Sequence, residues 1–398
     1  MKKPLLILAF VSAAMVHAET SGPPTKMLCA ILADDIAAHR NAVCSPYSLG
    51  CSMEMAALAA RGGTFDEIRA AFDLGNTSEA IAAAAARRRG ELAAAVRASS
   101  GELLVFNSFW SGPEDPLRPD FAILLRDGCD AEACRLSSRA GMSVADINHW
   151  VFRKTKGYVS SAVDDLPPET RLLLVNVIYF KMKWACEFNR YATTPWNFHP
   201  ETGNTQRVPF MNLVADVPVL DNGIYRAVRL PYRGGKFEME IVLPNTGRTV
   251  ADVLAAWETG AADPMHEAFS SPLSAEIYLP RFHIRDVRTL SQPLQERGVT
   301  TAFHYGADFT GAFERHSSQL FLSDVRQSAF IDVDEEGTTA AATTIHIGIG
   351  CAAEDVPMRW YFLVDRPFLF LLRFAGNGDI LFAGTVFDAA AAGKGVGR

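Results

Sequence analysis

The chain has 398 residues, of which 49% are hydrophobic, 10% aromatic and 21% charged, a mixture that excludes collagen-like, low-complexity and wholly disordered proteins. Lysine and arginine number 38 against 45 aspartate and glutamate, which gives a net charge of -7. Because phosphate binding requires concentrated cations, an acidic chain without a basic stripe is not expected to bind nucleic acid.

The first residues are typical of a secretory signal. Lys2 and Lys3 precede the apolar run Pro4–Val16, and Val16-His17-Ala18 offers small residues at the spacing that a signal peptidase reads. We predict a signal peptide over residues 1–18 and a secreted, extracellular mature chain. This run is too short to span a bilayer, and no later segment reaches about 18 apolar residues without a charge, so no membrane partner is expected.

The seven cysteines are scattered, odd in number and without a C-x-x-C pair, so neither a zinc site nor another cofactor is expected. In an exported chain at least one thiol stays free or pairs between molecules. Asn76-Thr77-Ser78 is the only N-glycosylation sequon and lies in a polar stretch that is expected to be a loop. We therefore predict glycosylation at Asn76.

Helical patterns fill the chain up to about residue 160. Apolar residues recur at three- and four-residue spacing in Met27–Arg40 and Ser48–Ala60. The sequence Thr64-Phe65-Asp66-Glu67 predicts a capping box ahead of a helix over Ile68–Leu74, and Ser143 is expected to cap a helix over Val144–Lys154.

Strand patterns follow. Leu172–Phe180 is a nearly continuous apolar run, as expected of a strand that is covered on both faces. In the stretch 237–243, apolar residues alternate with Glu238 and Glu240, which predicts a half-buried strand with both carboxylates on the outer face.

Two later segments complete the pattern. Ala329, Ile331 and Val333 alternate with acidic residues, and the strands Phe368–Phe374 and Ile380–Phe387 flank Asn377-Gly378, a strong hairpin signal. Helices first and strands afterwards, without a Pro/Gly/Ser-rich linker, predict one α+β body with more than one sheet.

Enzyme motifs are not found. The chain has no G-x-S-x-G elbow, and His266-Glu267 lacks the second histidine that a zincin helix requires. We therefore expect no enzyme. Arg87-Arg88-Arg89 could bind a heparin-like polyanion, although three arginines on an Ala-rich helix more often form a solvated face.

The least ordinary stretch is Asp332–Cys351, DVDEEGTTAAATTIHIGIGC. After the acids and Gly337, every residue from Thr338 to Thr344 is small, and the threonines favour strand over helix. Small side chains suit a segment that must slide between two existing strands, and Gly337 would supply the freedom of a hinge. A surface loop that happens to be Ala-rich is the alternative.

The tract Val333-Asp334-Glu335-Glu336-Gly337-Thr338 with its Ala/Thr continuation closely resembles the reactive-loop hinge of the serpins. The resemblance covers nearly the whole mature chain, and its motifs are specific and occur in the family's order. The further matching segments are Asn41–Leu49, Ile147–Val159, Leu174–Phe188, Leu279–Phe282, Ala307–Gly311, Asp365–Phe370 and Ile380–Gly384.

The resemblance implies an α+β serpin fold with three β-sheets, eight or nine helices and an exposed reactive-centre loop over 337–361. The single domain would span 19–388 and be followed by a flexible C-terminal tail, 389–398. A target serine protease would cleave the loop and become trapped as an acyl-enzyme when the loop inserts as a new strand into the main sheet. The protein is expected to be a monomer.

The resemblance also implies site residues. The hinge would comprise Glu336, Gly337, Thr338, Thr339, Ala340, Ala341, Ala342 and Thr343. Family spacing places the reactive bond at Cys351–Ala352, so the target would accept small or medium apolar side chains. A polar cluster beneath the opening strands, called the shutter, would comprise Ser45, Ser48, Asn176 and Gln327, and Trp184 would mark the top of the sheet, called the breach.

Several alternatives stay open. A bait at Glu354 or Asp355 would direct the protein to acid-specific proteases, and a cysteine protease is a second kind of target. If Thr338 faces inward on insertion, so do His346 and Gly348, which suit a buried face poorly. Slow or incomplete insertion would make the loop a substrate, and the protein would then be a non-inhibitory serpin acting as carrier, chaperone or signalling ligand.

Overall fold

The computed structural model describes residues 22–99, 101–137, 142–157, 159, 161–167, 169–313, 320–338 and 359–393. The predicted signal peptide, the hinge residues from Thr339 onward and the predicted reactive bond Cys351–Ala352 lie outside this part of the chain.

The helices are α1 (Pro23–Ala37), α2 (Pro46–Ala59), α3 (Gly62–Phe72), α4 (Ser78–Ser99), α5 (Pro119–Cys129), α6 (Met142–Lys154), α7 (Val250–Thr259), α8 (Ser291–Glu296) and α9 (Ala389–Ala392), with short 3-10 turns at Arg190–Ala192 and Thr301–Phe303.

The strands form three sheets. The main sheet has the order β11 (Phe282–Thr289), β12 (Asp324–Val333), β13 (Gly337–Thr338), β4 (Leu172–Lys183), β2 (Glu102–Ser111) and β3 (Ala131–Arg135). The second sheet has the order β1 (Ala42–Cys44), β16 (Ile380–Val386), β15 (Phe368–Phe374), β9 (Phe237–Pro244), β8 (Tyr225–Pro231) and β7 (Val219–Asp221). A four-stranded sheet contains β14 (Trp360–Leu363), β10 (Leu273–Pro280), β6 (Gln206–Val217) and β5 (Thr194–Phe198).

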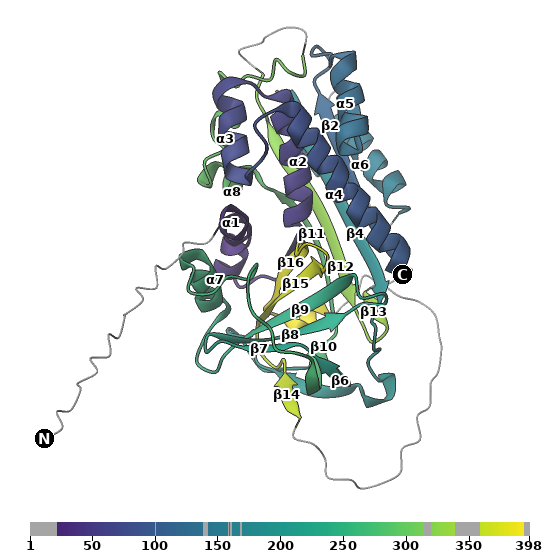
Figure 1. The fold of residues 1–398 in the computed structure, drawn as a ribbon, viewed down its shortest axis with the longest axis vertical. Helices are drawn as coiled ribbons and strands as arrows, with labels where there is room; N and C mark the ends of the chain where they lie inside the picture. The colour runs from purple at the N-terminus through teal and green to yellow at the C-terminus, as the bar shows by residue number, and fades with distance from the viewer. Residues whose placement is uncertain are drawn as a thin grey trace, which may run out of the picture.

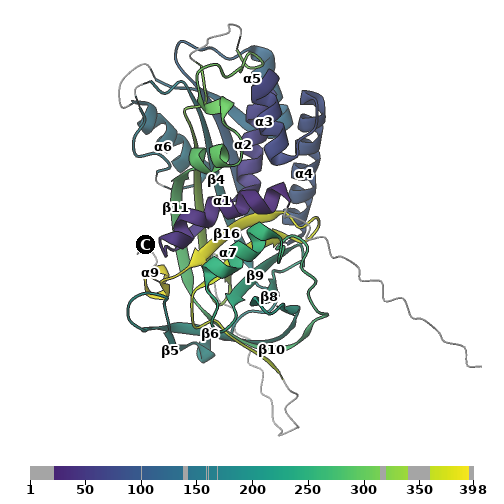
Figure 2. The same cartoon turned by 90° about the vertical axis from the view of Figure 1, so that its left-hand side faces the viewer.

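The long strands β4 and β12 connect two ends of the molecule (Figure 1). Helices α2 to α6 gather around one end, and the second and four-stranded sheets occupy the other end. Helix α1 crosses the body where the helical and strand-rich ends meet (Figure 2). The short strand β13 lies at the strand-rich end of β4 and β12.

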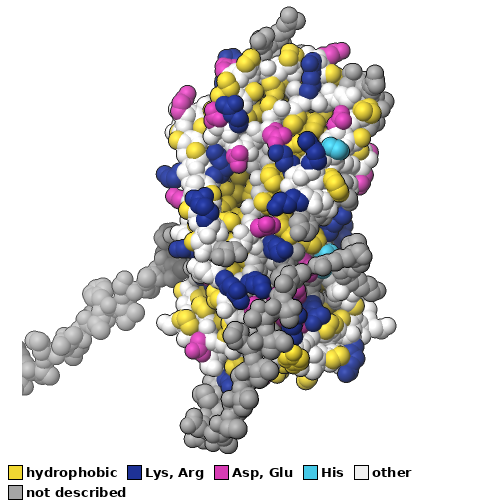
Figure 3. Space-filling view, turned by 90° about the vertical axis from the view of Figure 1, so that its right-hand side faces the viewer, with side chains coloured by type: hydrophobic (Ala, Val, Ile, Leu, Met, Phe, Trp, Pro, Cys, Tyr) yellow, Lys and Arg dark blue, Asp and Glu magenta, His cyan; other side chains and the backbone are white. Residues whose placement is uncertain are grey.

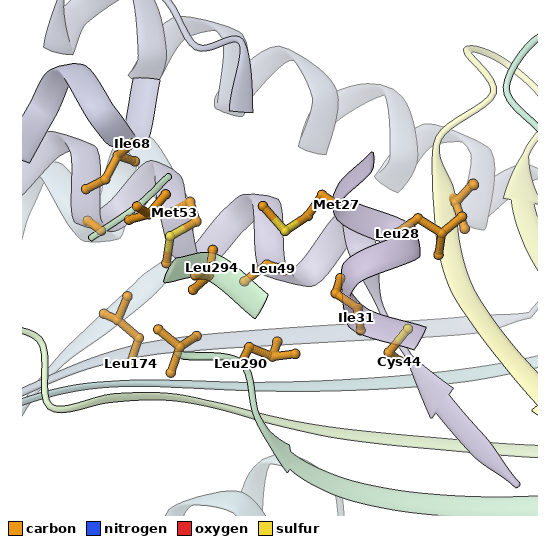
Figure 4. Packing of buried hydrophobic residues seen from close by; sticks show 14 of the residues in the cluster. Met27, Leu28, Ile31, Cys44, Leu49, Met53, Ile68, Leu174, Leu290 and Leu294 are labelled. Carbon is orange, nitrogen blue, oxygen red and sulfur yellow. The ribbon is translucent and has the colours of Figure 1, made fainter. Parts of the chain in front are cut away.

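The core has two large apolar clusters. One joins α1, α2, α3 and α8 to the main sheet through residues such as Leu28, Leu49, Met53 and Leu174 (Figure 4). The other fills the space between the main and second sheets and includes Phe180 and other ring-bearing residues. Because every residue from Leu172 to Phe180 is buried, β4 is covered on both faces, as its apolar run predicts.

The predicted architecture is confirmed: the described residues form an α+β body with three sheets and nine helices. The hairpin is confirmed too, with β15 and β16 paired antiparallel on either side of Asn377-Gly378. The tail prediction is wrong at its start, because residues 389–392 form α9. Asp388 caps this helix by accepting a hydrogen bond from the Ala391 amide at 2.8 Å.

Two capping predictions are wrong. Helix α3 begins at Gly62, and its Glu67 carboxylate accepts hydrogen bonds from the amides of Thr300 and Thr301 at 2.8 and 2.7 Å instead of capping its own helix. Helix α6 begins at Met142, so Ser143 lies inside the first turn. In both cases a contact with a segment outside the helix replaces the local cap.

The outer-face prediction for Glu240 is also wrong. This side chain is completely buried in β9. Arg373 of β15 donates to its carboxylate at 2.9 Å, and Arg229 of β8 does so at 3.1 Å. The neighbouring strands therefore supply cations that neutralise the carboxylate, which a period-two pattern alone cannot reveal.

Candidate functional site

The main sheet is split at one end. Strands β12 and β4 pair directly and in parallel from Asp324 opposite Leu173 to Phe330 opposite Tyr179; we call this stretch the seam. Beyond it, β13 lies between them, with Thr338 opposite Val333 on one side and Met182 on the other. We call this split end the fork. A strand that extended β13 along the seam would have to part β12 from β4.

A tight turn directs the chain from β12 back into the fork. The Asp334 amide donates to the Gly337 carbonyl at 3.0 Å. The Asp334 carboxylate accepts from the amides of Glu336 and Gly337 at 2.9 and 3.1 Å, which is the local bonding that favours aspartate at turns. The sequence DEEG therefore closes the turn with its own polar groups.

Gly337 has a steric role. A Cβ atom at this position would lie 2.7 Å from the Lys183 Cα and would collide with the Met182 carbonyl oxygen. Glycine is therefore required by the close approach of the two backbones in the fork. The sequence predicts glycine here for conformational freedom, and the structure supplies this different reason.

The two glutamates of the turn are buried and paired with cations. Arg281 donates to the Glu335 carboxylate through Nη2 and Nε at 2.6 and 2.9 Å, and the Thr193 hydroxyl donates to it at 2.5 Å. Glu336 pairs with Arg190 and lies 3.5 Å from the Lys183 ammonium. These partners come from segments distant in the sequence, and no local sequence motif predicts them.

The surroundings of the turn shift the pKa values of Glu335 and Asp334 in opposite directions. Burial acts to raise the pKa of Glu335, but hydrogen bonds from Arg281 and Thr193 outweigh it and lower that pKa below its usual range. Burial raises the pKa of Asp334 to about 6, the Gly337 amide works against this rise, and the charges of Asp332 and Glu335 add to it. The pKa values of these two adjacent carboxyls are therefore shifted in opposite directions.

Trp184, the predicted breach residue, lies at the fork. Its indole nitrogen donates to the Asp334 carbonyl at 2.8 Å, and its amide donates to the Glu336 carbonyl at 2.9 Å. The ring stacks on Tyr232 with centroids 4.4 Å apart, and the Tyr232 hydroxyl lies 2.7 Å from the Thr338 hydroxyl. Thr338, the last described hinge residue, is thus fully buried. The sequence gives no signal for Tyr232.

The four predicted shutter residues meet beneath the seam. Gln327 accepts from the Ser45 amide at 2.8 Å and donates to the Ser45 carbonyl at 2.9 Å, so β12 is bonded to the start of α2. Ser45 also caps α2 by accepting from the Ser48 amide at 3.0 Å. Asn176 lies opposite Gln327 in the register, yet its amide donates to Asn107 of β2. The side chains on the two sides of the seam therefore bond away from each other.

Several buried polar atoms near the seam have no hydrogen-bond partner in the described part of the chain. They are the hydroxyl oxygens of Ser48, Ser52 and Ser328 and the Asn176 side-chain oxygen. A buried polar atom without a partner costs about 1–3 kcal/mol. Most of these atoms therefore lie along the seam, whereas at the fork the one such atom is Glu336 Oε2, which lies 3.5 Å from the Lys183 ammonium.

The remaining predicted sites lie elsewhere. Asn76 is exposed between α3 and α4. In the run of three arginines, Arg88 pairs with the buried Glu54, and Arg89 donates to the Gly128 and Asp127 carbonyls. Of the three, only Arg87 is classed as exposed, so the geometry does not support a polyanion site at this run.

Charges on the face shown in Figure 3 are mixed: lysine and arginine lie among aspartate, glutamate and apolar patches. Among the described residues no cluster of His, Cys, Asp and Glu has the makings of a metal site. Within the same residues no helix is long and apolar enough to cross a membrane.

The main sheet thus holds the two-residue strand β13 at the fork and is closed by direct pairing of β12 with β4 along the seam. Residues 25–389 match the family model described as Serpin (serine protease inhibitor). The chain belongs to the serpin family, most of whose members are protease inhibitors and not enzymes.

Relatives are found across distant organisms. The chain is 29% identical over 366 residues to Iripin-8 of Ixodes ricinus, with 87% of each chain covered. The native-state structure of the thermophilic serpin tengpin superimposes with a TM-score of 0.82 at 23% identity, covering 92% of this chain and 93% of that one. Thyroxine-binding globulin in complex with thyroxine superimposes with a TM-score of 0.78 at 22% identity, covering 92% and 98%.

Proposed function

We propose that this serpin is a secreted suicide inhibitor of a serine protease. The observation that carries the proposal is the fork: Thr338 is already buried between β12 and β4, and the next residues, from Thr339 to Thr344, are all small. Continued insertion along the seam would therefore meet no bulky side chain before Ile345.

The reaction begins as ordinary proteolysis. The protease serine attacks the carbonyl carbon of Cys351, the bond to Ala352 breaks, and the new amine of Ala352 leaves with the proton from the protease histidine. The hinge side of the loop is then joined to the protease through an ester. Free of its far attachment, this segment enters the seam and carries the protease with it.

Insertion supplies enough free energy to disturb the protease. About twelve inserted residues would each gain roughly one ladder hydrogen bond at ~0.5–1.5 kcal/mol, on the order of 6–18 kcal/mol in all. This is comparable with the whole stability of an ordinary domain, so it suffices to distort a protease active site and stall deacylation. The intact form must then be held by a kinetic barrier.

Cys351 at the bait position favours proteases whose primary pocket takes small or medium apolar side chains. An elastase-like or chymotrypsin-like enzyme fits this description. Cleavage at Glu354 or Asp355 would indicate an acid-specific protease, and a thioester-linked complex would indicate a cysteine protease.

Secretion and a monomeric state belong to the proposal. The exposed position of Asn76 between two helices supports its glycosylation in an exported chain. The signal-like start, Lys2 to Ala18, supports export.

The test is incubation with pancreatic elastase and with chymotrypsin, followed by a denaturing gel. We expect a covalent band at the summed mass of inhibitor and protease, and a released peptide that begins at Ala352. Complete cleavage with recovery of active protease from both reactions would contradict inhibition and support a carrier, chaperone or signalling serpin.

A further inference from the structure

The four-stranded sheet has one buried face and one outer face. In β10, Ala275, Ile277 and Leu279 are fully buried, whereas Glu276 and Tyr278 between them are partly exposed. This alternation is the period-two pattern of a strand that is covered on one face only. The sheet lies at the strand-rich end of the molecule (Figure 1), so its outer face is part of the molecular surface.

Aromatic side chains gather on this outer face. Glu276 lies opposite Tyr361 of β14 and Val214 of β6. The ring of Tyr278 lies 5.6 Å from that of Tyr361 and 6.4 Å from that of Trp196 in β5, centroid to centroid. Tyr361, Trp196 and Val214 are 49%, 47% and 42% exposed. We call the surface of these five residues the aromatic platform; large apolar side chains that gather on a surface in this way indicate a binding site.

The charge of the platform is negative. Glu276 accepts a hydrogen bond from the Tyr278 hydroxyl at 2.8 Å through one oxygen, and no lysine or arginine of the described chain forms an ion pair with it. Burial and the charges of Glu276 and Asp365 raise the pKa of Tyr361. The exposed Arg359 stands two residues before Tyr361, so two carboxylates and one guanidinium lie at or beside the rings.

Two ring groups of the platform can donate hydrogen bonds. The indole nitrogen of Trp196 and the hydroxyl of Tyr361 bond to none of the described residues. A ligand with many carbonyl acceptors and few donors suits such groups. A proline-rich peptide has this chemistry, because proline lacks the backbone N–H and the polyproline II helix leaves its carbonyls without internal hydrogen bonds.

The spacing of the rings also fits a polyproline II helix. This helix rises about 3.1 Å per residue, so two residues span about 6.2 Å. The two ring separations of the platform, 5.6 and 6.4 Å, lie on either side of this value. Because the helix is already formed in the free peptide, little conformational entropy is lost when it binds to aromatic side chains.

We propose that the aromatic platform binds a proline-rich peptide in the polyproline II conformation that carries an arginine or lysine. The proline rings pack against Trp196, Tyr278 and Tyr361, and the cation lies at the Glu276 carboxylate in a charge-assisted hydrogen bond. A neutral glycan also stacks on aromatic rings, but its hydroxyl groups need several acceptors, and the platform offers one carboxylate. This surface goes beyond the proposed function and requires no protease.

The experiment is isothermal titration of the intact protein with end-capped nonapeptides. We expect a proline peptide with a central arginine to bind with a Kd on the order of 10–100 μM. The same peptide with a central glutamate should bind at least fivefold more weakly. A flexible glycine-serine peptide with a central arginine should bind at least tenfold more weakly, because it must be ordered on binding. Equal binding of the arginine and glutamate peptides would overturn the proposal.

Three variants locate the surface. Trp196→Ala and Tyr361→Ala should each weaken the arginine peptide at least fivefold. Glu276→Gln keeps an acceptor for Tyr278 and should remove the preference for arginine over glutamate. Tyr305→Ala is the matched control, because this tyrosine is 76% exposed and its ring packs on Phe321, outside the platform.

Unchanged binding of the arginine peptide in all three platform variants would overturn the proposal. Binding of cellohexaose or of phosphatidylcholine vesicles without binding of the peptide would do so too, because the platform would then recognise a glycan or a membrane. Inhibition of a protease enters none of these readouts, so their outcome is independent of the proposed function.

Discussion

The fork and the seam belong to the same sheet but differ in how their polar groups are satisfied. At the fork, Asp334, Glu335 and Thr338 each bond to a defined partner. Along the seam, Ser328 and Asn176 hold buried oxygen atoms without partners in the described chain. Under the proposed mechanism, the difference indicates where the sheet would part: most of the unsatisfied oxygen atoms lie along the seam, and the turn at the fork is held by hydrogen-bonded and ion-paired groups.

The strongest way to break this comparison is to change Thr338, the residue that would lead insertion under the proposed mechanism. Thr338→Arg would place a cation in a fully buried position beside Tyr232, and an unpaired buried charge costs several kcal/mol. We expect the covalent complex with the protease trapped by the wild type to fall at least tenfold on a denaturing gel, while loop cleavage continues.

Thr338→Ser is the control for this change, because it keeps the hydroxyl that meets Tyr232. It should form the complex nearly as well as the wild type. A Thr338→Arg protein that traps as much protease as the wild type would show that burial of this residue is not needed for trapping.

The next effect concerns the carboxylate that Arg281 and Thr193 bind. Glu335→Gln should lower the free energy of unfolding of the intact form by about 1–2 kcal/mol. This is less than the loss of a fully buried ion pair would cost, because Arg281 is partly exposed and solvent screens its charge. Urea titration of the intact protein measures it. Glu187→Gln, which breaks an ion pair with the largely exposed Arg233, should change it by less than about 0.5 kcal/mol; equal effects of the two variants would contradict a special role for the fork.

The fold could be predicted in large part because its signals are local. The continuous apolar run of β4 predicts a buried strand, and the Asn377-Gly378 turn predicts a hairpin; both signals lie within a few residues. The partners of the fork could not be predicted, since Arg281 and Tyr232 lie far along the chain from Glu335 and Thr338. Such pairs are set by the topology of three sheets, which a periodic pattern does not encode.

The errors have the same origin. The sequence predicts that Glu67 caps a helix and that Glu240 faces solvent. Each carboxylate instead accepts a hydrogen bond from another segment. A carboxylate in a regular pattern reports local preference, and tertiary contacts can override that preference. The bonding of Gln327 and Asn176, which is directed away from the seam on both sides, is visible only in three dimensions.

The seam itself is tested by removing an unsatisfied hydroxyl. Ser328→Ala should stabilise the intact form by about 1 kcal/mol, because it removes a buried oxygen without a partner. Ser108→Ala is the matched change at a satisfied serine, which donates to the Val175 carbonyl and accepts from Trp110, and should destabilise the intact form by about 1–2 kcal/mol. Urea midpoints that move in the same direction would contradict the contrast between satisfied and unsatisfied sites.

The smallest expected effect is on pH dependence. The pKa of Asp334, about 6 in the folded chain, lies above the usual aspartate value, so this group favours the intact form once protonated and that contribution is lost as the pH rises through 6. Between pH 7.5 and 5 we expect the wild type to gain about 0.5–1 kcal/mol relative to Asp334→Asn. The ionised carboxylate of Glu335, whose pKa is lowered, stabilises the intact form throughout this pH range, and that contribution is lost only when the pH falls further.

Parallel pH profiles of wild type and Asp334→Asn between these limits would show that Asp334 does not titrate in this range. Asp332 and Arg190 remain in both proteins, so their charges cancel in the difference. The urea midpoint at five pH values is sufficient for the comparison.

The most direct measurement compares the melting temperature of the intact protein with that of protein nicked between residues 345 and 358 by a metalloprotease, which forms no acyl-enzyme. Insertion of the freed segment into the seam predicts a rise of more than about 10 °C. A nicked protein that melts at or below the temperature of the intact one would contradict the view that the main sheet is arranged to accept its own loop.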